Sequence, residues 1–192
     1  MKNTDKQIGD YFGRVISTLN GLDRKSIGAA AELVLETYEN GGTIYIFGNG
    51  GSAANASHFC GDLIKGVSYG RERRFKVVCL NDNIPAIMAI ANDISYADVF
   101  VEQLKNFAKP GDLVIGISGS GNSTNVVKAM EYAKGIGAKT IALCGFDGGK
   151  IKGIADICVH ANIRDMEVSE DVHLVVMHCI KNVIIDALNS RA

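Results

Sequence analysis

Residues 43–52 read Thr43-Ile44-Tyr45-Ile46-Phe47-Gly48-Asn49-Gly50-Gly51-Ser52, and an alanine-rich stretch follows them. A second stretch has the same organisation: apolar residues 113–117 lead into Ser118-Gly119-Ser120-Gly121-Asn122-Ser123. Each pattern predicts a strand that turns through glycine into a helix, so that backbone N–H groups gather at the positive end of the helix. Such a turn receives an anion, usually phosphate, and serine and asparagine add uncharged donors. Two such turns in one small chain predict a phosphorylated small-molecule ligand.

Apolar runs and helical patterns alternate along the chain. We expect helices at 5–19 and 23–39, the second ended by Gly41-Gly42, before the first strand. Continuous apolar strands alternating with helices predict an α/β fold, a three-layer doubly wound sheet of about five parallel strands, with ligands off the strands' carboxyl ends. The expected strands are 43–47, 75–80, 113–117, 140–144 and a weaker one at 156–160; the later helices are 53–65, 85–91, 99–107, 124–134 and 168–188.

The composition indicates one globular domain, 1–192, with 47% hydrophobic and 21% charged residues. A net charge of −1 argues against nucleic acid or an acidic membrane as a partner. Five cysteines without CxxC spacing read as reduced thiols, and the polar N-terminus lacks the apolar core of a signal peptide, so we expect a cytoplasmic protein. The basic cluster at 71–76 is either a solvated loop or a phosphate or partner contact.

Imidazole and carboxylate groups occur in two places. His58 and Asp62 are four residues apart on one predicted helix and share a face, while Glu170 and His178 lie on the last helix. Together they could bind a divalent metal or transfer protons, although His178 alone would read as a core histidine. Glu170 and His178 are about 12 Å apart along a continuous helix. Both reach one centre only if that helix begins after Glu170 or if two subunits share the site.

Three other patterns have competing interpretations. Gly48-x-Gly50-x-x-Ala53 matches a dinucleotide turn, with Asp82 as a ribose-binding acid, but the second, hydroxyl-rich turn has no role in such a site. Because no GxxxxGK[ST] is present either, we expect no nucleotide cofactor. Asp93 is either a helix N-cap or a ligand contact, and Asp147-Gly148-Gly149 reads as a turn.

The two turns, His58-Phe59, Ala91-Asn92-Asp93 and Val172-His173-Leu174 with His178 resemble the sugar isomerase (SIS) domain, and within it the phosphoheptose isomerases. The similarity covers nearly the whole chain. It implies a homotetramer with active sites shared between subunits, in which the helices at about 5–40 serve packing and oligomerisation. It also implies a phosphorylated sugar substrate, sedoheptulose 7-phosphate, converted to D-glycero-D-manno-heptose 7-phosphate through an enediol(ate).

The resemblance also implies roles for individual residues. Asp62 stands where the family has its base and His178 where it has its acid. Members that bind zinc do so at the positions of His58, Asp62, Glu170 and His178, so a divalent metal, zinc first, is the expected cofactor. The implied substrate-binding residues are Asn49, Gly50, Gly51, Ser52, Asp93, Ser118, Gly119, Ser120, Ser123 and Glu170.

Three positions depart from the family pattern. Asp62 replaces a glutamate, Gly119 replaces the threonine of a Ser-Thr-Ser turn, and Glu170 replaces a glutamine. The carboxylate of Glu170 favours a metal site, because carboxylates bind a dication better than amides do. These departures leave another sugar phosphate open as substrate. They also leave a second class of function open, a non-catalytic SIS protein that senses a sugar phosphate or binds a partner protein, and a phosphosugar lyase beyond it.

Overall fold

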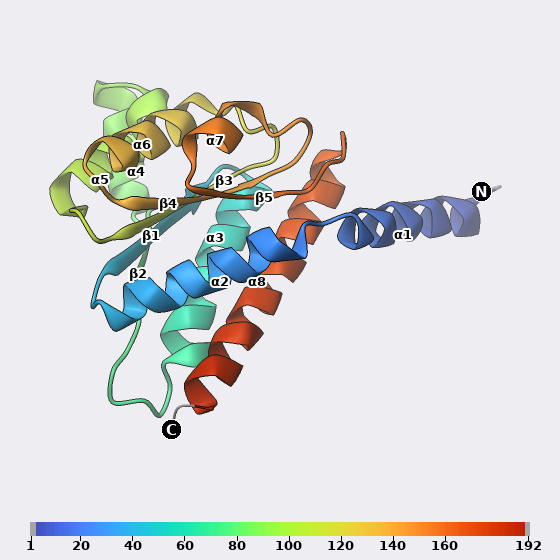
Figure 1. Ribbon diagram of the computed structural model, residues 1–192. Helices are drawn as coiled ribbons and strands as arrows, with labels where there is room; N and C mark the ends of the chain where they lie inside the picture. The colour runs from blue at the N-terminus through green and yellow to red at the C-terminus, as the bar shows by residue number, and fades with distance from the viewer. Residues whose placement is uncertain (1–2, 191–192) are drawn as a thin grey trace.

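The computed structural model describes residues 3–190, and the two outermost residues at each end of the expected domain 1–192 lie outside that range. One sheet of five parallel strands forms its centre (Figure 1). Helices cover both faces of the sheet, so the predicted fold class is confirmed. The strands are β1 (Thr43–Gly48), β2 (Lys76–Cys79), β3 (Leu113–Ser118), β4 (Lys139–Cys144) and β5 (Ile157–His160), and their spatial order is β2-β1-β3-β4-β5.

All expected helices are present, and a short one that was not expected follows β4. It begins directly after Gly148, because the glycine turn predicted there leads straight into it. The last helix begins two residues earlier than expected because the Asp165 side chain caps it, accepting from the Val168 N–H. The α-helices are α1 (Thr4–Asn20), α2 (Arg24–Glu39), α3 (Gly51–Gly61), α4 (Ile84–Asp93), α5 (Val101–Phe107), α6 (Thr124–Gly135), α7 (Gly149–Ile154) and α8 (Met166–Asn189); a π-helical turn (Asp62–Val67) extends α3, and a 3₁₀ turn (Tyr96–Asp98) precedes α5.

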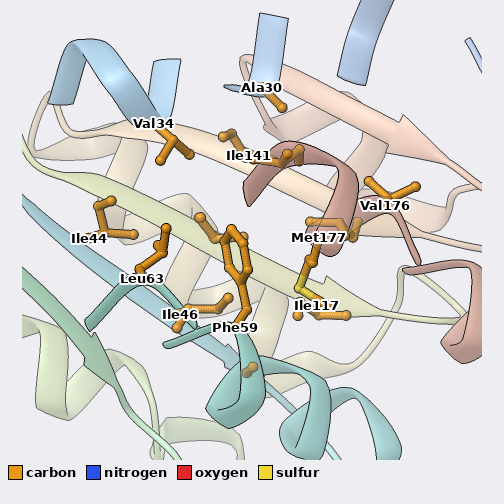
Figure 2. Packing of buried hydrophobic residues seen from close by; sticks show 14 of the residues in the cluster. Ala30, Val34, Ile44, Ile46, Phe59, Leu63, Ile117, Ile141, Val176 and Met177 are labelled. Carbon is orange, nitrogen blue, oxygen red and sulfur yellow. The ribbon is translucent and has the colours of Figure 1, made fainter. Parts of the chain in front are cut away.

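Alternate residues of each strand face opposite layers. In β1, Ile44 and Ile46 point toward α2, α3 and α8, where they meet Phe59 in the cluster shown in Figure 2. Phe47 points to the other face and stacks on Phe100, with the ring centroids 4.8 Å apart. In the central strands β1 and β3 both faces are covered, so most residues are apolar and buried and a periodicity of two is missing, whereas the edge strand β2 alternates exposed and buried residues.

The strand order places a topological switch point between β1 and β3. The chain leaves β1 toward β2 on one side, and the later strands are added on the other side of β3. Gly48 and Ile117 are register partners at the carboxyl ends of these two strands. A Cβ at Gly48 would lie 2.7 Å from the Ser52 Cβ, so only glycine lets the helix start this close to the strand. Ligands of open α/β sheets bind at such a point.

The first helix projects from the body of the molecule (Figure 1). Ile8, Phe12 and Ile16 on α1 are exposed. Among the described residues, no helix combines the length and the hydropathy that a membrane span needs.

Candidate active site

A cavity of about 240 Å³ opens where β1 and β3 end. The two glycine turns and the first turn of α8 form its walls. Of the expected substrate-binding residues, only Gly51 and Asp93 are absent from its lining. The residues that line it are Asn49, Gly50, Ser52, Ile117, Ser118, Gly119, Ser120, Ser123, Met166 and Glu170.

The second turn presents its hydroxyl groups to this cavity. The Ser118 and Ser123 Oγ atoms are 3.1 Å apart, and the Ser120 Oγ accepts a hydrogen bond from the Asn122 N–H at 3.2 Å. Ser123 is the N-cap of α6 but makes no side-chain capping bond. The Val126 N–H donates to the Asn125 Oδ1 at 2.9 Å, so the N–H groups of Thr124 and Asn125 are the ones available to an anion at the positive end of the helix dipole.

The loop after β4 holds this turn in place. Three residues of the turn itself accept hydrogen bonds from main-chain N–H groups of this loop and of α7, so the position of the serines depends on these contacts more than on their own side chains. These bonds run from the Gly145 N–H to the Gly119 carbonyl (2.8 Å), from the Ile151 N–H to the Gly121 carbonyl (3.1 Å) and from the Lys150 N–H to the Asn122 Oδ1 (3.2 Å).

The first turn is organised differently, because a carboxylate of the chain itself lies at its helix. The Ser52 N–H is hydrogen-bonded to the Glu170 carboxylate, and a Cβ at Gly51 would overlap that carboxylate. The Asn55 Nδ2 also donates to the Glu170 main-chain carbonyl at 2.9 Å. Burial raises the pKa of Glu170, although the Ser52 N–H opposes the shift. The N-terminus of α3 thus already faces an acidic group, and of the two turns the serine turn is the one open to phosphate.

Three side chains meet at one place: His58 of α3, Asp62 of the π-helical turn and His178 of α8. The Asp62 Oδ2 lies 3.6 Å from the His58 Nε2 and 3.4 Å from the His178 Nε2, and the two Nε2 atoms are 2.8 Å apart. Lys181 Nζ lies 3.3 Å from the other carboxylate oxygen, Oδ1. The Oδ2 atom is buried and has no hydrogen-bond partner among the described residues. Asp62 is also the first residue of the π-helical turn, a distortion often found at functional sites.

This group fits a divalent cation by its donors and their spacing. Its three ligand atoms lie within 4.8 Å of one another. Ligands about 2.0–2.1 Å from a tetrahedral zinc lie roughly 3.4 Å apart. Both nitrogen–oxygen separations here are close to that value, and the two imidazole nitrogens, 2.8 Å apart, would have to separate slightly to bind one ion. Two imidazoles and one carboxylate with an open fourth position form a catalytic type of zinc site.

Glu170 does not join this group within one chain. Helix α8 runs unbroken from Met166 to Asn189, so the expectation that it might begin after Glu170 is wrong. Eight residues of helix, about 12 Å, separate Glu170 from His178. The serine-lined cavity and the His58–Asp62–His178 group are therefore two places in one subunit.

Asp93 is not an N-cap, which corrects one of its two interpretations. It is the last residue of α4, is exposed, and its Oδ1 accepts a 2.7 Å hydrogen bond from the neighbouring Asn92 Nδ2. It lies outside the lining of the cavity in this chain.

Four residues of the site were not anticipated. Asn125 and Tyr96 bind the Asn49 side chain, Lys181 pairs with Asp62, and Met166 forms one wall of the cavity. Only Asn125 carried a local signal, since it lies in the first turn of the helix after the serines. The others come from distant segments and belong to residue types that are common everywhere.

The chain is similar to proteins of known family in sequence and in structure. The SIS domain model matches residues 9–145. The chain is 38% identical over 178 residues to the "Probable phosphoheptose isomerase" of Thermoplasma volcanium, covering 92% of this chain and 90% of the relative. It is 40% identical over 164 residues to the phosphoheptose isomerase of Helicobacter pylori, covering 85% and 84%. The solved phosphoheptose isomerase of Neisseria gonorrhoeae matches with a TM-score of 0.87 at 30% identity, over 94% of this chain and 97% of that one.

Proposed function

Because the chain belongs to the SIS domain family, among the phosphoheptose isomerases, we propose that it is an aldose–ketose isomerase converting sedoheptulose 7-phosphate to D-glycero-D-manno-heptose 7-phosphate. The observation that carries the proposal is a serine-lined anion pocket at the β1–β3 switch point in a chain that also gathers His58, Asp62 and His178. The pocket supplies phosphate recognition, and the group supplies proton transfer.

Phosphate binding falls to the serine turn. The Ser118, Ser120 and Ser123 hydroxyls and the N-terminus of α6 donate to the phosphate oxygens. Gly50 and Ser52, with Asn49, line the sugar side of the cavity. Binding energy from the distant phosphate then holds the reacting carbons in place, which is how an isomerase can use a non-reacting group to raise its rate.

Proton transfer falls to Asp62 and His178. Asp62 removes a proton from C1 of the ketose while His178 donates one to the C2 carbonyl oxygen, which gives an enediol. Loss of the O1 proton and return of a proton to C2 then give the aldose. Lys181 holds the Asp62 carboxylate in place, and Oδ2, which makes no hydrogen bond among the described residues, is the atom that accepts the proton where no metal is bound.

His58, Asp62 and His178 would hold a divalent metal, with zinc the first candidate, and Glu170 of a neighbouring subunit would complete the set. Such an ion polarises a carbonyl and stabilises charge on its oxygen. The Oδ2 of Asp62, buried without a hydrogen-bond partner among the described residues, favours it. A carboxylate or imidazole bound to a metal is a poorer proton carrier, so the metal and direct proton transfer by Asp62 and His178 are alternatives. The carboxylate of Glu170 at the α3 N-terminus argues against a dinucleotide, whose pyrophosphate would need that same place.

We propose further that the active site is shared within a homotetramer. The two halves of the site are separate in one subunit, so a second copy must bring its His58, Asp62 and His178 toward the serine turn. The projecting α1, with Ile8, Phe12 and Ile16 exposed, offers an apolar surface for such packing. Nearby, residues of α1, α2 and α8 line an apolar groove of about 320 Å³.

The test is hydrogen exchange in D₂O, followed by NMR at the carbons beside the carbonyl. Sedoheptulose 7-phosphate and shorter ketose phosphates are each incubated with the protein, with and without a chelator. We expect exchange and aldose formation with the seven-carbon substrate, and a loss on the order of 10²–10⁴ in rate for His178→Ala. Glu131→Ala, an exposed change on α6, is the matched control and should leave the rate unaltered. Tight binding of these sugars without any exchange would favour the non-catalytic sensor instead.

A further inference from the structure

One wall of the phosphate-binding cavity is a thioether. Met166 is the first residue of α8 and lines the cavity beside Gly119 and Ser120. A Cβ built on Gly119 would overlap the Met166 Sδ and lie 3.3 Å from its Cε. The methionine therefore occupies the space that any side chain at position 119 would need.

Neighbouring contacts fix the first turn of α8, while Met166 itself is 39% exposed. Asp165, the N-cap of α8, accepts from the Val168 N–H at 3.1 Å and pairs with Arg14 on α1 at 3.4 Å. One turn further, a Cβ on Gly145 would overlap the Ser169 Oγ, so this turn of α8 packs directly on the loop that holds Gly119. The first turn of α8 consequently has little room to move away from the serine turn.

The cavity thus has two chemically different sides. The hydroxyl groups of the serine turn face it from one side. The first turn of α8 lines the other side with the Met166 thioether and the Glu170 carboxylate, neither of which has a hydrogen to donate. Inorganic phosphate has polar oxygens on every side, and the oxygen that faces the thioether finds no hydrogen-bond donor there. A phosphate ester avoids this loss, because its ester methylene turns an apolar surface toward the sulfur.

We infer that Met166 is a specificity-determining residue, which with Gly119 makes the cavity select a primary phosphate monoester over inorganic phosphate. The inference rests on the proposed function and deepens it, since it states which end of the sugar phosphate the cavity recognises and how. Met166 contacts the carbon next to the phosphate, and the three serines contact the phosphate itself. Gly119 is required because it leaves room for the methionine.

The experiment is calorimetric binding of two probes to the full-length protein: heptitol 7-phosphate, which has no carbonyl and cannot react, and inorganic phosphate. We expect Met166→Ala to weaken the heptitol ester about fourfold, the effect of roughly one buried methylene, and to leave inorganic phosphate unchanged. Met166→Leu, which keeps the apolar volume, should retain the wild-type ratio. An equal effect on both probes, or none on either, would overturn the inference.

Gly119→Ala tests the pairing of the two residues. Its added methyl group should displace the Met166 thioether and weaken binding of the ester about as much as Met166→Ala does, about fourfold. The double variant Gly119→Ala/Met166→Ala should then bind the ester as Met166→Ala does, since no thioether is left to displace; a double variant about sixteenfold weaker than wild type, in which the two effects add, would refute the pairing. Circular dichroism of each variant checks folding, and the double variant keeps the test valid if Gly119→Ala does not fold. Neither probe reacts, so these binding measurements do not depend on catalysis. If the protein shows the expected binding ratios but no turnover of sedoheptulose 7-phosphate, the isomerase proposal is rejected and the role of Met166 is kept.

Discussion

The side-chain amides of Asn49 and Asn125 face each other and exchange two hydrogen bonds, each 2.9 Å long. Asn49 belongs to the first glycine turn and Asn125, which is buried, to the first turn of α6 after the serines. The Tyr96 hydroxyl also donates to the Asn49 Oδ1 at 2.9 Å. This amide pair is a direct side-chain link between the two turns that form the cavity.

Asn125→Asp should break this link without changing its shape. The aspartate places an oxygen where the Asn125 Nδ2 now donates, so two acceptors oppose each other in a buried position. We expect a loss of about 2 kcal/mol in the free energy of unfolding, measured by urea denaturation at pH 7, and a higher KM for sugar phosphate.

Asn106→Asp is the control for this change. The Asn106 Nδ2 donates to the Glu102 carbonyl on the exposed side of α5, away from the cavity. Asn106→Asp should change the free energy of unfolding by less than about 0.5 kcal/mol and leave the KM for sugar phosphate unchanged. Equal effects of the two variants would show that the pair between the turns has no special role.

His173 should make the protein sensitive to mild acid. It is fully buried on α8, and burial lowers its pKa from the usual 6.5 to about 4, although the Cys144 main chain opposes the shift. Between these values the unfolded state binds a proton that the folded state does not. Stability is therefore full above about pH 6.5 and falls as the pH drops toward 4, by about 3 kcal/mol for this residue.

Urea denaturation at pH 7.5, 6, 5 and 4.5 measures this loss, with His173→Leu compared to wild type. The variant should lose less stability across this interval, because leucine has no proton to bind. Parallel curves for the two proteins would assign the acid sensitivity to other groups, the carboxylates of the surface ion pairs among them.

Much of the fold follows from local sequence. The strands are predictable because both faces of the sheet are covered, so that β1 and β3 are unbroken apolar runs. Both turns are predictable because glycine and serine mark them within six residues. The short α7 was missed, since a six-residue helix that begins with glycine has weak helical propensity.

The site could be predicted only in part, because its remaining members depend on long-range packing. The contact between His58 and Asp62 is predictable, because residues four positions apart lie on the same face of a helix. Lys181 is 119 residues away from Asp62, and Met166 is 47 positions after Gly119, so neither contact leaves a trace in local sequence. Whether Glu170 and His178 meet depends on subunit packing, which a single chain does not encode in any local pattern.

Metal binding should separate Asp62 from Glu170. Asp62→Asn removes a ligand from the group within one subunit and should weaken zinc at least about tenfold, by analogy with losses of 10- to 100-fold for groups that merely support ligands. In the proposed oligomer, where a neighbouring subunit contributes Glu170, Glu170→Gln should weaken zinc binding to a similar extent. In monomers it should leave zinc binding unchanged. Calorimetry of both variants, with analytical ultracentrifugation to define the oligomer, measures this. Unchanged zinc affinity in Asp62→Asn would remove the metal from the proposed site.

Mixing two inactive variants tests most directly the proposal that the active site is shared between subunits. Ser120→Ala/Ser123→Ala damages the phosphate turn and His178→Ala damages the acid, so each homo-oligomer should be nearly inactive. After the two are unfolded together and refolded, about a quarter of the sites in a random mixture join an intact serine turn from one subunit to an intact His178 from another. Activity should therefore return to about a quarter of the wild-type value. Mixtures that stay inactive, although native mass spectrometry shows oligomers that contain both variants, would mean that both halves of each site come from one subunit.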